Sequence, residues 1–146
     1  MPGLAGCARS VAVPPPDPSP TGTAAQECAQ LWAALPGTLE GQGRRATEPD
    51  GVTTTAAWGD PPIVLRCGVG RPEDMAPTSE AVEIDGVSWF PQQLTAGYRF
   101  TTTGLGTRVE VTVPAAYAPE TGPLVDLSPV IAASMPSVTR KAVPAS

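Results

Sequence analysis

The most reactive side chains of this sequence are three cysteines, at positions 7, 28 and 67, and the chain contains no histidine. Cys7 ends the run Leu4-Ala5-Gly6-Cys7, which has the pattern of a bacterial lipobox, where the cysteine is lipidated and becomes the first residue of the mature protein. Such a site normally follows a charged segment and an apolar run of about 7–15 residues, whereas only Met-Pro-Gly precedes it here. We therefore interpret residues 1–7 as a truncated signal peptide, and expect Cys7 to anchor the protein to a membrane only if the full signal peptide is present.

The two other cysteines, Cys28 and Cys67, are predicted to face the core from different elements. An even number of remaining cysteines in an exported protein argues for a disulfide bond, here across 39 positions (67 − 28). Two buried free thiols of a cytosolic protein are the alternative. A redox-active pair fits less well, because the chain lacks the CxxC spacing and places no lysine or histidine near either cysteine to favour a thiolate.

The absence of histidine removes the commonest acid/base residue of enzymes. It excludes a Ser-His-Asp triad, a Cys-His pair and zinc sites with histidine ligands. A hydrolase that uses two carboxylates stays open, but the acids within predicted elements form no evident pair, and we assign them to a solvated sheet face: Asp60, Glu83, Asp85, Glu110 and Asp126. We therefore predict no catalytic residue, no cofactor and no metal site.

The formal net charge is −5, and the few basic residues form no cluster. Nucleic-acid-binding domains carry such clusters, so we predict no nucleic-acid partner. No stretch of the sequence approaches the roughly 20 apolar residues that a membrane-spanning helix needs. Any contact with a membrane is therefore predicted to pass through a lipid on Cys7.

Proline spacing divides the chain into a tether and a domain. Residues 8–22 hold prolines at 14, 15, 16, 18 and 20, which favour an extended, polyproline-like spacer. A helix is predicted over 23–35, because Thr23 and Gln26 fit a capping box and apolar residues follow at helical spacing, namely Cys28, Leu31, Trp32 and Leu35. Residues 1–22 are thus read as signal remnant, lipobox and tether, residues 23–136 as one globular domain, and residues 137–146 as a flexible tail.

Short alternating runs predict an antiparallel sheet, whereas residues 37–51 are predicted to form a loop. The predicted strands cover 52–58, 63–69, 82–84, 87–90, 98–103 and 107–113, with a short one at 124–127. Asp85-Gly86 and Gly104-Leu105-Gly106 predict hairpin turns. Ser128 and Pro129 fit the start of a short helix. The predicted fold is α+β, with five or six antiparallel strands covered on one face by the N-terminal helix, and with a short C-terminal helix.

The densest cluster of unusual residues is Trp58-Gly59-Asp60-Pro61-Pro62. If Trp58 is exposed with Asp60 and Arg66 beside it, it forms a platform for a sugar ring or a partner protein. Trp89 is a further candidate, because Trp89 and Phe90 alternate faces of one strand. In the alternative, the tryptophans pack in the core, Asp60 caps the turn and Arg66 pairs with Asp60 or another acid across the hairpin.

Several runs together resemble a family of actinobacterial secreted lipoproteins that is catalogued only as a domain of unknown function. These runs are LAGC, AAQECAQLWAALPGTLEGQGRR, TAAWGDPPIVLRCGVGRP, VEIDGVSWF, YRFTTTG and VEVTVPAAYAPETGPLVDLSPVIAASMP. The resemblance extends from about Cys7 to Pro136, and the run WGDPPIVLRCG is specific. It implies lipidation of Cys7 and a bond between Cys28 and Cys67, and it implies no catalytic residue.

These observations predict a non-enzymatic domain that is anchored to the outer face of the cytoplasmic membrane. It would act by contact with another envelope protein or a cell-wall component. A small-ligand carrier with a pocket between helix and sheet is the alternative. A carboxylate hydrolase ranks last, because the chain has no histidine and no evident acid pair.

Overall fold

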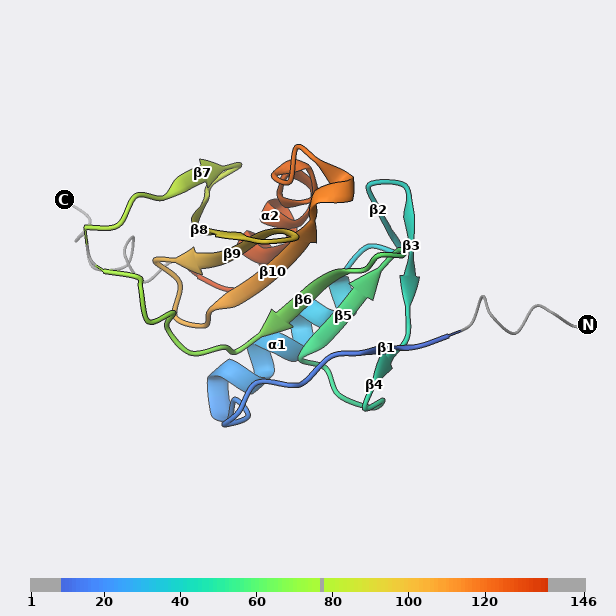
Figure 1. Ribbon diagram of the computed structural model, residues 1–146. Coiled ribbons are helices and arrows are strands. Elements are labelled where there is room, and N and C mark those ends of the chain that lie inside the picture. Colours follow the sequence, from blue (N-terminus) through green and yellow to red (C-terminus); the bar gives the residue numbers. More distant parts are fainter. Residues whose placement is uncertain (1–8, 77, 137–146) are drawn as a thin grey trace, which may run out of the picture.

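The computed structural model describes residues 9–76 and 78–136, and it is built on one main antiparallel sheet (Figure 1). Cys7 with its predicted lipid, and the predicted tail 137–146, lie outside the described residues. In chain order the elements are β1 (Val11–Ala12), α1 (Gly22–Ala34), β2 (Thr38–Leu39), β3 (Gln42–Arg45), β4 (Thr47–Glu48), β5 (Thr55–Trp58), β6 (Ile63–Cys67), β7 (Val82–Ile84), β8 (Val87–Leu94), β9 (Gly97–Thr103), β10 (Val109–Pro114), the 3-10 helix η2 (Ala115–Tyr117) and α2 (Gly122–Ser134).

The main sheet has eight strands in the order β2-β3-β5-β6-β10-β9-β8-β7. The α+β class and the antiparallel pairing are confirmed, but the sheet is larger than the predicted five or six strands, because residues 37–51 form strands rather than a loop. Glu40 and Gly41 join β2 to β3 with positive φ angles of 53° and 76°. Glutamate is uncommon in that conformation. The turn carries Glu-Gly in place of the Asn-Gly or Asp-Gly pair that predicts a two-residue hairpin, so the sequence pattern does not indicate this hairpin.

The hairpins predicted from their turn residues are confirmed. Asp85 and Gly86, with φ angles of 49° and 87°, join β7 to β8, and β9 pairs with β10 in antiparallel register. β6 pairs with β10 rather than with β7, its successor in sequence, and Cys67 lies opposite Val109. The sheet therefore brings together strands that are far apart in the chain.

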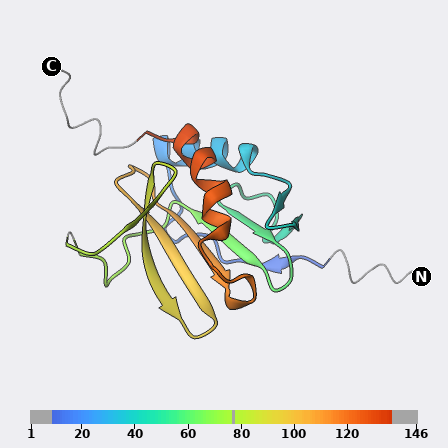
Figure 2. The same cartoon turned by 90° about the horizontal axis from the view of Figure 1, so that it is seen from above.

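Both helices pack on the same face of the sheet and share one hydrophobic core with it. Figure 2 shows α1 and α2 against each other on this side of the sheet. Every second residue of β6 faces the core, as Ile63, Leu65 and Cys67 do, which is the period of a strand with one face buried. The helices contribute the fully buried residues Cys28, Leu31, Leu124, Leu127 and Ile131.

The helix predicted over 23–35 is confirmed as α1, with two differences in detail. Thr21 is the N-cap residue and makes no side-chain cap hydrogen bond, so the predicted capping box at Thr23 does not form. Trp32, which the helical spacing predicts to be buried, is 38% exposed. The buried stripe of α1 is therefore narrower than the spacing of its apolar residues suggested.

The strand predicted over 124–127 is wrong, because these residues belong to α2, which begins at Gly122 rather than at Ser128. Pro129 lies inside α2 on an exposed side, where it removes one backbone donor from the helix. Ser128 is buried, and its Oγ accepts a hydrogen bond from Nε1 of Trp89 at 3.0 Å. Ser128 and Pro129 therefore lie within α2 and do not mark its start. The helix continues through them because most of its stability comes from packing of its buried face.

The proline-rich segment, predicted as a tether, lies against the domain. β1 pairs in parallel with β4, and the N–H of Val13 donates to the carbonyl of Glu48 at 3.0 Å. Val13 is 2% exposed. Further along, Pro20 packs so closely on Gly68 that a Cβ there would lie 2.6 Å from the proline ring. From Arg9 onward, the segment is part of the folded body rather than a free tether.

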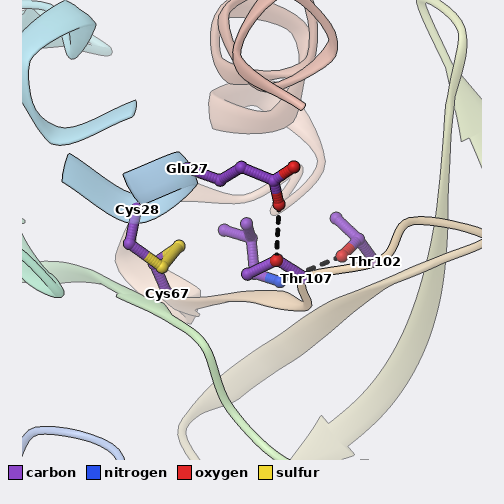
Figure 3. The surroundings of a disulfide bond; sticks show 6 residues. Glu27, Cys28, Cys67, Thr102 and Thr107 are labelled. Atoms are coloured by element: carbon purple, nitrogen blue, oxygen red, sulfur yellow. Dashed lines mark hydrogen bonds between the residues drawn. A yellow bond between two sulfur atoms is a disulfide. The ribbon is translucent and has the colours of Figure 1, made fainter. Parts of the chain in front are cut away.

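The predicted bond between Cys28 and Cys67 is confirmed, with their Cα atoms 5.6 Å apart and both residues at most 1% exposed. It joins α1 to β6 across the core. Figure 3 shows Glu27, the neighbour of Cys28, pointing to Thr107, whose hydroxyl donates to Oε1 of Glu27 at 2.6 Å. A covalent and a polar contact therefore hold the same turn of α1 to the sheet.

Replacing both Cys28 and Cys67 by alanine should lower the melting temperature by about 8 °C or more. Closing a loop of this length stabilises a fold by roughly 4 kcal/mol, and one kcal/mol corresponds to roughly 2–8 °C for domains of this size. Differential scanning calorimetry measures the effect, and reductant should lower the melting temperature of the wild type but leave the double variant unchanged. Equal melting temperatures would contradict a stabilising role of the bond.

Candidate functional site

The two tryptophans of the predicted binding surface are inside the protein. Trp58 and Trp89 are both 0% exposed, so neither forms a platform, and the alternative of core packing holds for both. Each indole N–H has an internal acceptor: Nε1 of Trp58 donates to the carbonyl of Pro36 at 2.9 Å, and Nε1 of Trp89 to Oγ of Ser128. A buried tryptophan needs such a partner for its only polar atom.

Asp60 and Arg66, the other two predicted surface residues, are not brought together. Asp60 is exposed in the turn before β6, whereas Arg66 lies near the other end of that strand. Beside the turn, the hydroxyl of Tyr117 donates to the carbonyl of Pro61 at 2.6 Å. Burial, and then the negative charge of Asp60, raise the pKa of Tyr117 above its ordinary value. The turn is therefore held in place by a neutral tyrosine.

Arg66 points to the outer face of the sheet, away from the helices. There it stands in a row with Glu110, Thr101 and Phe90, each directly opposite the next on β10, β9 and β8. Nε of Arg66 lies 3.4 Å from Oε1 of Glu110, and these side chains are 27% and 16% exposed. The predicted acid partner of Arg66 thus exists, but it comes from β10 and not from the β5–β6 hairpin.

The next row on the same face is a chain of polar contacts that reaches the loop between β6 and β7. Nε of Arg99 donates to Oε1 of Gln92 at 3.2 Å, and Nε2 of Gln92 donates to Oδ1 of Asp74 at 2.8 Å. Asp74 belongs to that loop, while Arg99 and Gln92 lie opposite each other on β9 and β8. The chain of contacts ties the loop to the sheet.

An open hollow of about 540 Å³, which we call the outer groove, is lined by Arg66, Glu110, Gln92, Arg99 and residues 69–74 of the loop. Its walls carry three arginines and three acids: Arg66, Arg71, Arg99, Glu73, Asp74 and Glu110. Arg71 also lines an adjoining hollow of about 340 Å³, which extends the groove toward Phe90 and Arg108. The volume falls in the range of about 300–1,000 Å³ that is typical of ligand sites.

Two buried polar atoms beside Glu110 lack hydrogen-bond partners among residues 9–76 and 78–136. They are Nε of Arg66, whose contact with Glu110 is an ion pair without hydrogen-bond geometry, and Oγ1 of Thr101, a residue that is 0% exposed. Such unpaired groups are rare in folded proteins, because leaving one costs about 1–3 kcal/mol. Arg66 is a wall residue of the outer groove, whereas Thr101 lies beneath it and does not line it.

The acids considered for a hydrolase are not brought together in the outer groove. Glu83 and Glu110, the strand acids considered for a hydrolase, lie on β7 and β10 with β8 and β9 between them. Within the described part of the chain, no group of three or more histidine, cysteine, aspartate or glutamate residues is arranged to hold a metal ion. Guanidinium, amide and carboxylate groups of the walls are suited to polar contacts with a ligand that carries both charges.

Sequence reasoning placed one residue of the outer groove, Arg66, in the candidate site, assigned Glu110 to a solvated sheet face, and did not single out the others. A signal existed for Arg99, because it lies two residues before Thr101 on β9, and residues two apart on a strand share a face. That Arg99 and Arg66 line one hollow follows from the pairing of β6 with β10. Pairing between strands distant in sequence is not readable from their local patterns.

The fold and the outer groove define a disulfide-bonded α+β domain with a polar hollow on the open face of its sheet. Residues 7–139 match the model of a protein family described as "Protein of unknown function (DUF3515)", and the chain belongs to this family. No curated protein and no solved structure matches the chain. In the described residues, neither helix has the length and apolar character needed to cross a bilayer.

Alkaline pH should test the Tyr117 contact. Because the pKa of Tyr117 is raised in the folded state, the contribution of this tyrosine to stability is complete below its ordinary pKa of about 10 and is lost as pH rises through the raised value. Absorbance titration should therefore show a tyrosine that ionises later than free tyrosine.

The late ionisation should disappear in the Tyr117→Phe variant, whereas Tyr98→Phe, the matched control, should keep it. Persistence of the late component after Tyr117→Phe would show that the assignment is wrong. Removal of the phenol also removes its bond to Pro61, so the variant should lose about 0.5–1.5 kcal/mol of stability at neutral pH.

Proposed function

We propose that this protein is a non-enzymatic binding domain of the cell envelope, and that its outer groove holds a polar segment of another envelope protein or of a cell-wall component. The observation that supports this most directly is the hollow of about 540 Å³ whose walls carry arginines and acids together. The separation of Glu83 from Glu110 on the sheet is in line with a role without catalysis.

A location outside the cytoplasm follows from the bond between Cys28 and Cys67, because disulfides persist in oxidising compartments. Lipidation of Cys7, given a complete signal peptide, would attach the protein to the outer face of the cytoplasmic membrane. Arg9, two positions after Cys7, begins the segment that packs on the domain. The lipid would therefore hold the domain close to the membrane surface, with no long free tether between them.

The mixed charge of the outer groove favours a polypeptide over a uniformly charged polymer. Its walls carry arginines and acids together, and Gln92 adds an amide that both donates and accepts. Backbone amides and side chains of either sign find complementary groups in such a groove. A cell-wall component with both amino and carboxylate groups meets the same requirement, and the experiment below separates the two.

A second candidate function, carriage of a small apolar ligand, has one observation in its favour. A hollow of about 360 Å³ lies on the helix side of the sheet, beside the residues that precede α2. Tyr98 and Phe100 line it, with their rings stacked at a centroid distance of 5.7 Å. Its apolar walls fit a ligand that the polar outer groove would not hold.

The test compares two positions on opposite faces of the sheet. A photo-crosslinking amino acid at position 71, beside the outer groove, should capture a discrete partner from an envelope extract, while the same group at the exposed position 126 of α2 should not. Co-sedimentation with purified peptidoglycan then shows whether a cell-wall component binds instead of a protein. Equal capture from both positions would contradict the outer groove as the binding site.

Substitutions in the outer groove should weaken that capture. Arg66→Gln and Arg99→Gln should each reduce affinity by about tenfold or more, because a hydrogen bond to a charged group contributes about 1.5–3 kcal/mol. Arg9→Gln makes the same change of charge outside the groove and should leave affinity unaltered. If Tyr98→Ala weakened binding and both groove variants did not, the carrier function would replace this proposal.

A further inference from the structure

A second arginine site lies beside α1, away from the outer groove. The guanidinium of Arg44, on β3, is placed over two indole rings, with Cζ 5.0 Å from the ring centroid of Trp32 and 5.6 Å from that of Trp58. Trp58 lies opposite Arg44 on the neighbouring strand, and Trp32 comes from α1. Cation–π contacts with two rings fix the plane of the guanidinium.

Arg44 has no counterion in the part of the chain that the structure describes. No residue there accepts a hydrogen bond from its side chain or forms an ion pair with it. Burial lowers the pKa of Arg44, and no carboxylate offsets the effect. Acids are not scarce, since the chain has 14 of them against 9 basic residues. The charge is therefore partly desolvated and available to an anion from outside.

The surroundings of Arg44 form a small built site. A hollow of about 260 Å³ is lined by Trp32, Arg44, Arg45, Thr47 and Thr55 among others. Nε1 of Trp32 donates to the carbonyl of Thr55 at 3.0 Å, which holds the ring in place. The hydroxyls of Thr47 and Thr55 are 3.1 Å apart, and the guanidinium of Arg45 donates to the carbonyls of Gly59 and Arg9.

We propose that this hollow binds a carboxylate group, paired with the guanidinium of Arg44, while the apolar body that bears the carboxylate rests on the exposed part of Trp32. A carboxylate fits the planar fork of an arginine with two parallel hydrogen bonds. The other arginine of the hollow, Arg45, already donates to the carbonyls of Gly59 and Arg9, so Arg44 is the one whose guanidinium is left to pair with the carboxylate. The hollow is slightly smaller than usual ligand pockets of about 300 Å³ or more, so the bound group is a small acid or the C-terminus of a peptide.

Nuclear magnetic resonance of the three indole N–H groups tests this inference on the intact, oxidised protein. Titration with N-acetyl-alanyl-alanine should shift the signal of Trp32, which Trp32→Phe identifies by its loss. The same peptide with an amidated C-terminus should cause no shift. A shift of equal size with the amide would overturn the proposal, because the carboxylate would then be irrelevant.

Variants of Arg44 distinguish the contribution of the planar guanidinium from that of its positive charge. Arg44→Gln should reduce affinity for the free-acid peptide at least tenfold, and Arg44→Lys should weaken it as well, because an ammonium does not offer two parallel donors. Arg108→Gln, an arginine of the adjoining hollow on the outer face, is the matched control and should bind normally. Unchanged binding by Arg44→Gln, in a variant whose indole spectrum is otherwise native, would overturn the assignment.

Two further titrations define the ligand. Inorganic phosphate should bind more weakly than the peptide, and tighter binding of phosphate would overturn the preference for carboxylate. N-acetyl-alanine distinguishes the sources of the carboxylate. Equal affinity for it and for the dipeptide would identify a small acid as the ligand, and an affinity that rises with peptide length would identify a polypeptide C-terminus.

Discussion

The disulfide bond between Cys28 of α1 and Cys67 of β6 positions elements of both candidate sites, the outer groove and the hollow beside Arg44. Cys28 lies one helical turn before Trp32, so the bond to Cys67 sets the position from which Trp32 reaches Arg44. Cys67 follows Arg66 directly on β6, and neighbouring residues of a strand point to opposite faces. The same bond therefore orients the side chain that forms one end of the outer groove. Loss of the bond would loosen a structural element of each site.

Two arginines illustrate how differently this fold treats positive charge. Arg66 is paired with Glu110 on the floor of a groove whose walls carry both signs. Arg44 is held by aromatic rings and has no acid partner in the described residues. An ion pair that is partly exposed contributes little to stability, and a guanidinium stacked on indoles without a counterion is costly to bury. Each of these arginines is assigned to a ligand by the two proposals above.

The tryptophans show why residue type alone is a poor guide to a binding surface. Trp58 and Trp89 sit in the most distinctive stretches of the sequence, and both fill the core with their N–H groups paired internally. Trp32, in an ordinary amphipathic helix, is the one that reaches the surface, at 38% exposure. Large aromatic residues bury the most apolar area in a small domain, and exposure depends on which neighbours cover them.

Local pattern by itself determined much of this protein: the helix at Cys28, the alternating strand at Cys67, the disulfide between them, and the hairpin at Asp85-Gly86. These features depend on residues close in sequence or, for the bond, on the count of cysteines. Tertiary structure decided the rest. It paired β6 with β10, drew β2 and β3 into the sheet, folded the proline-rich segment onto the body, and made residues 122–134 a helix although they contain Ser128-Pro129. The physical reason is that burial and strand pairing act between distant segments and outweigh local preferences of a few tenths of a kcal/mol to about 3 kcal/mol.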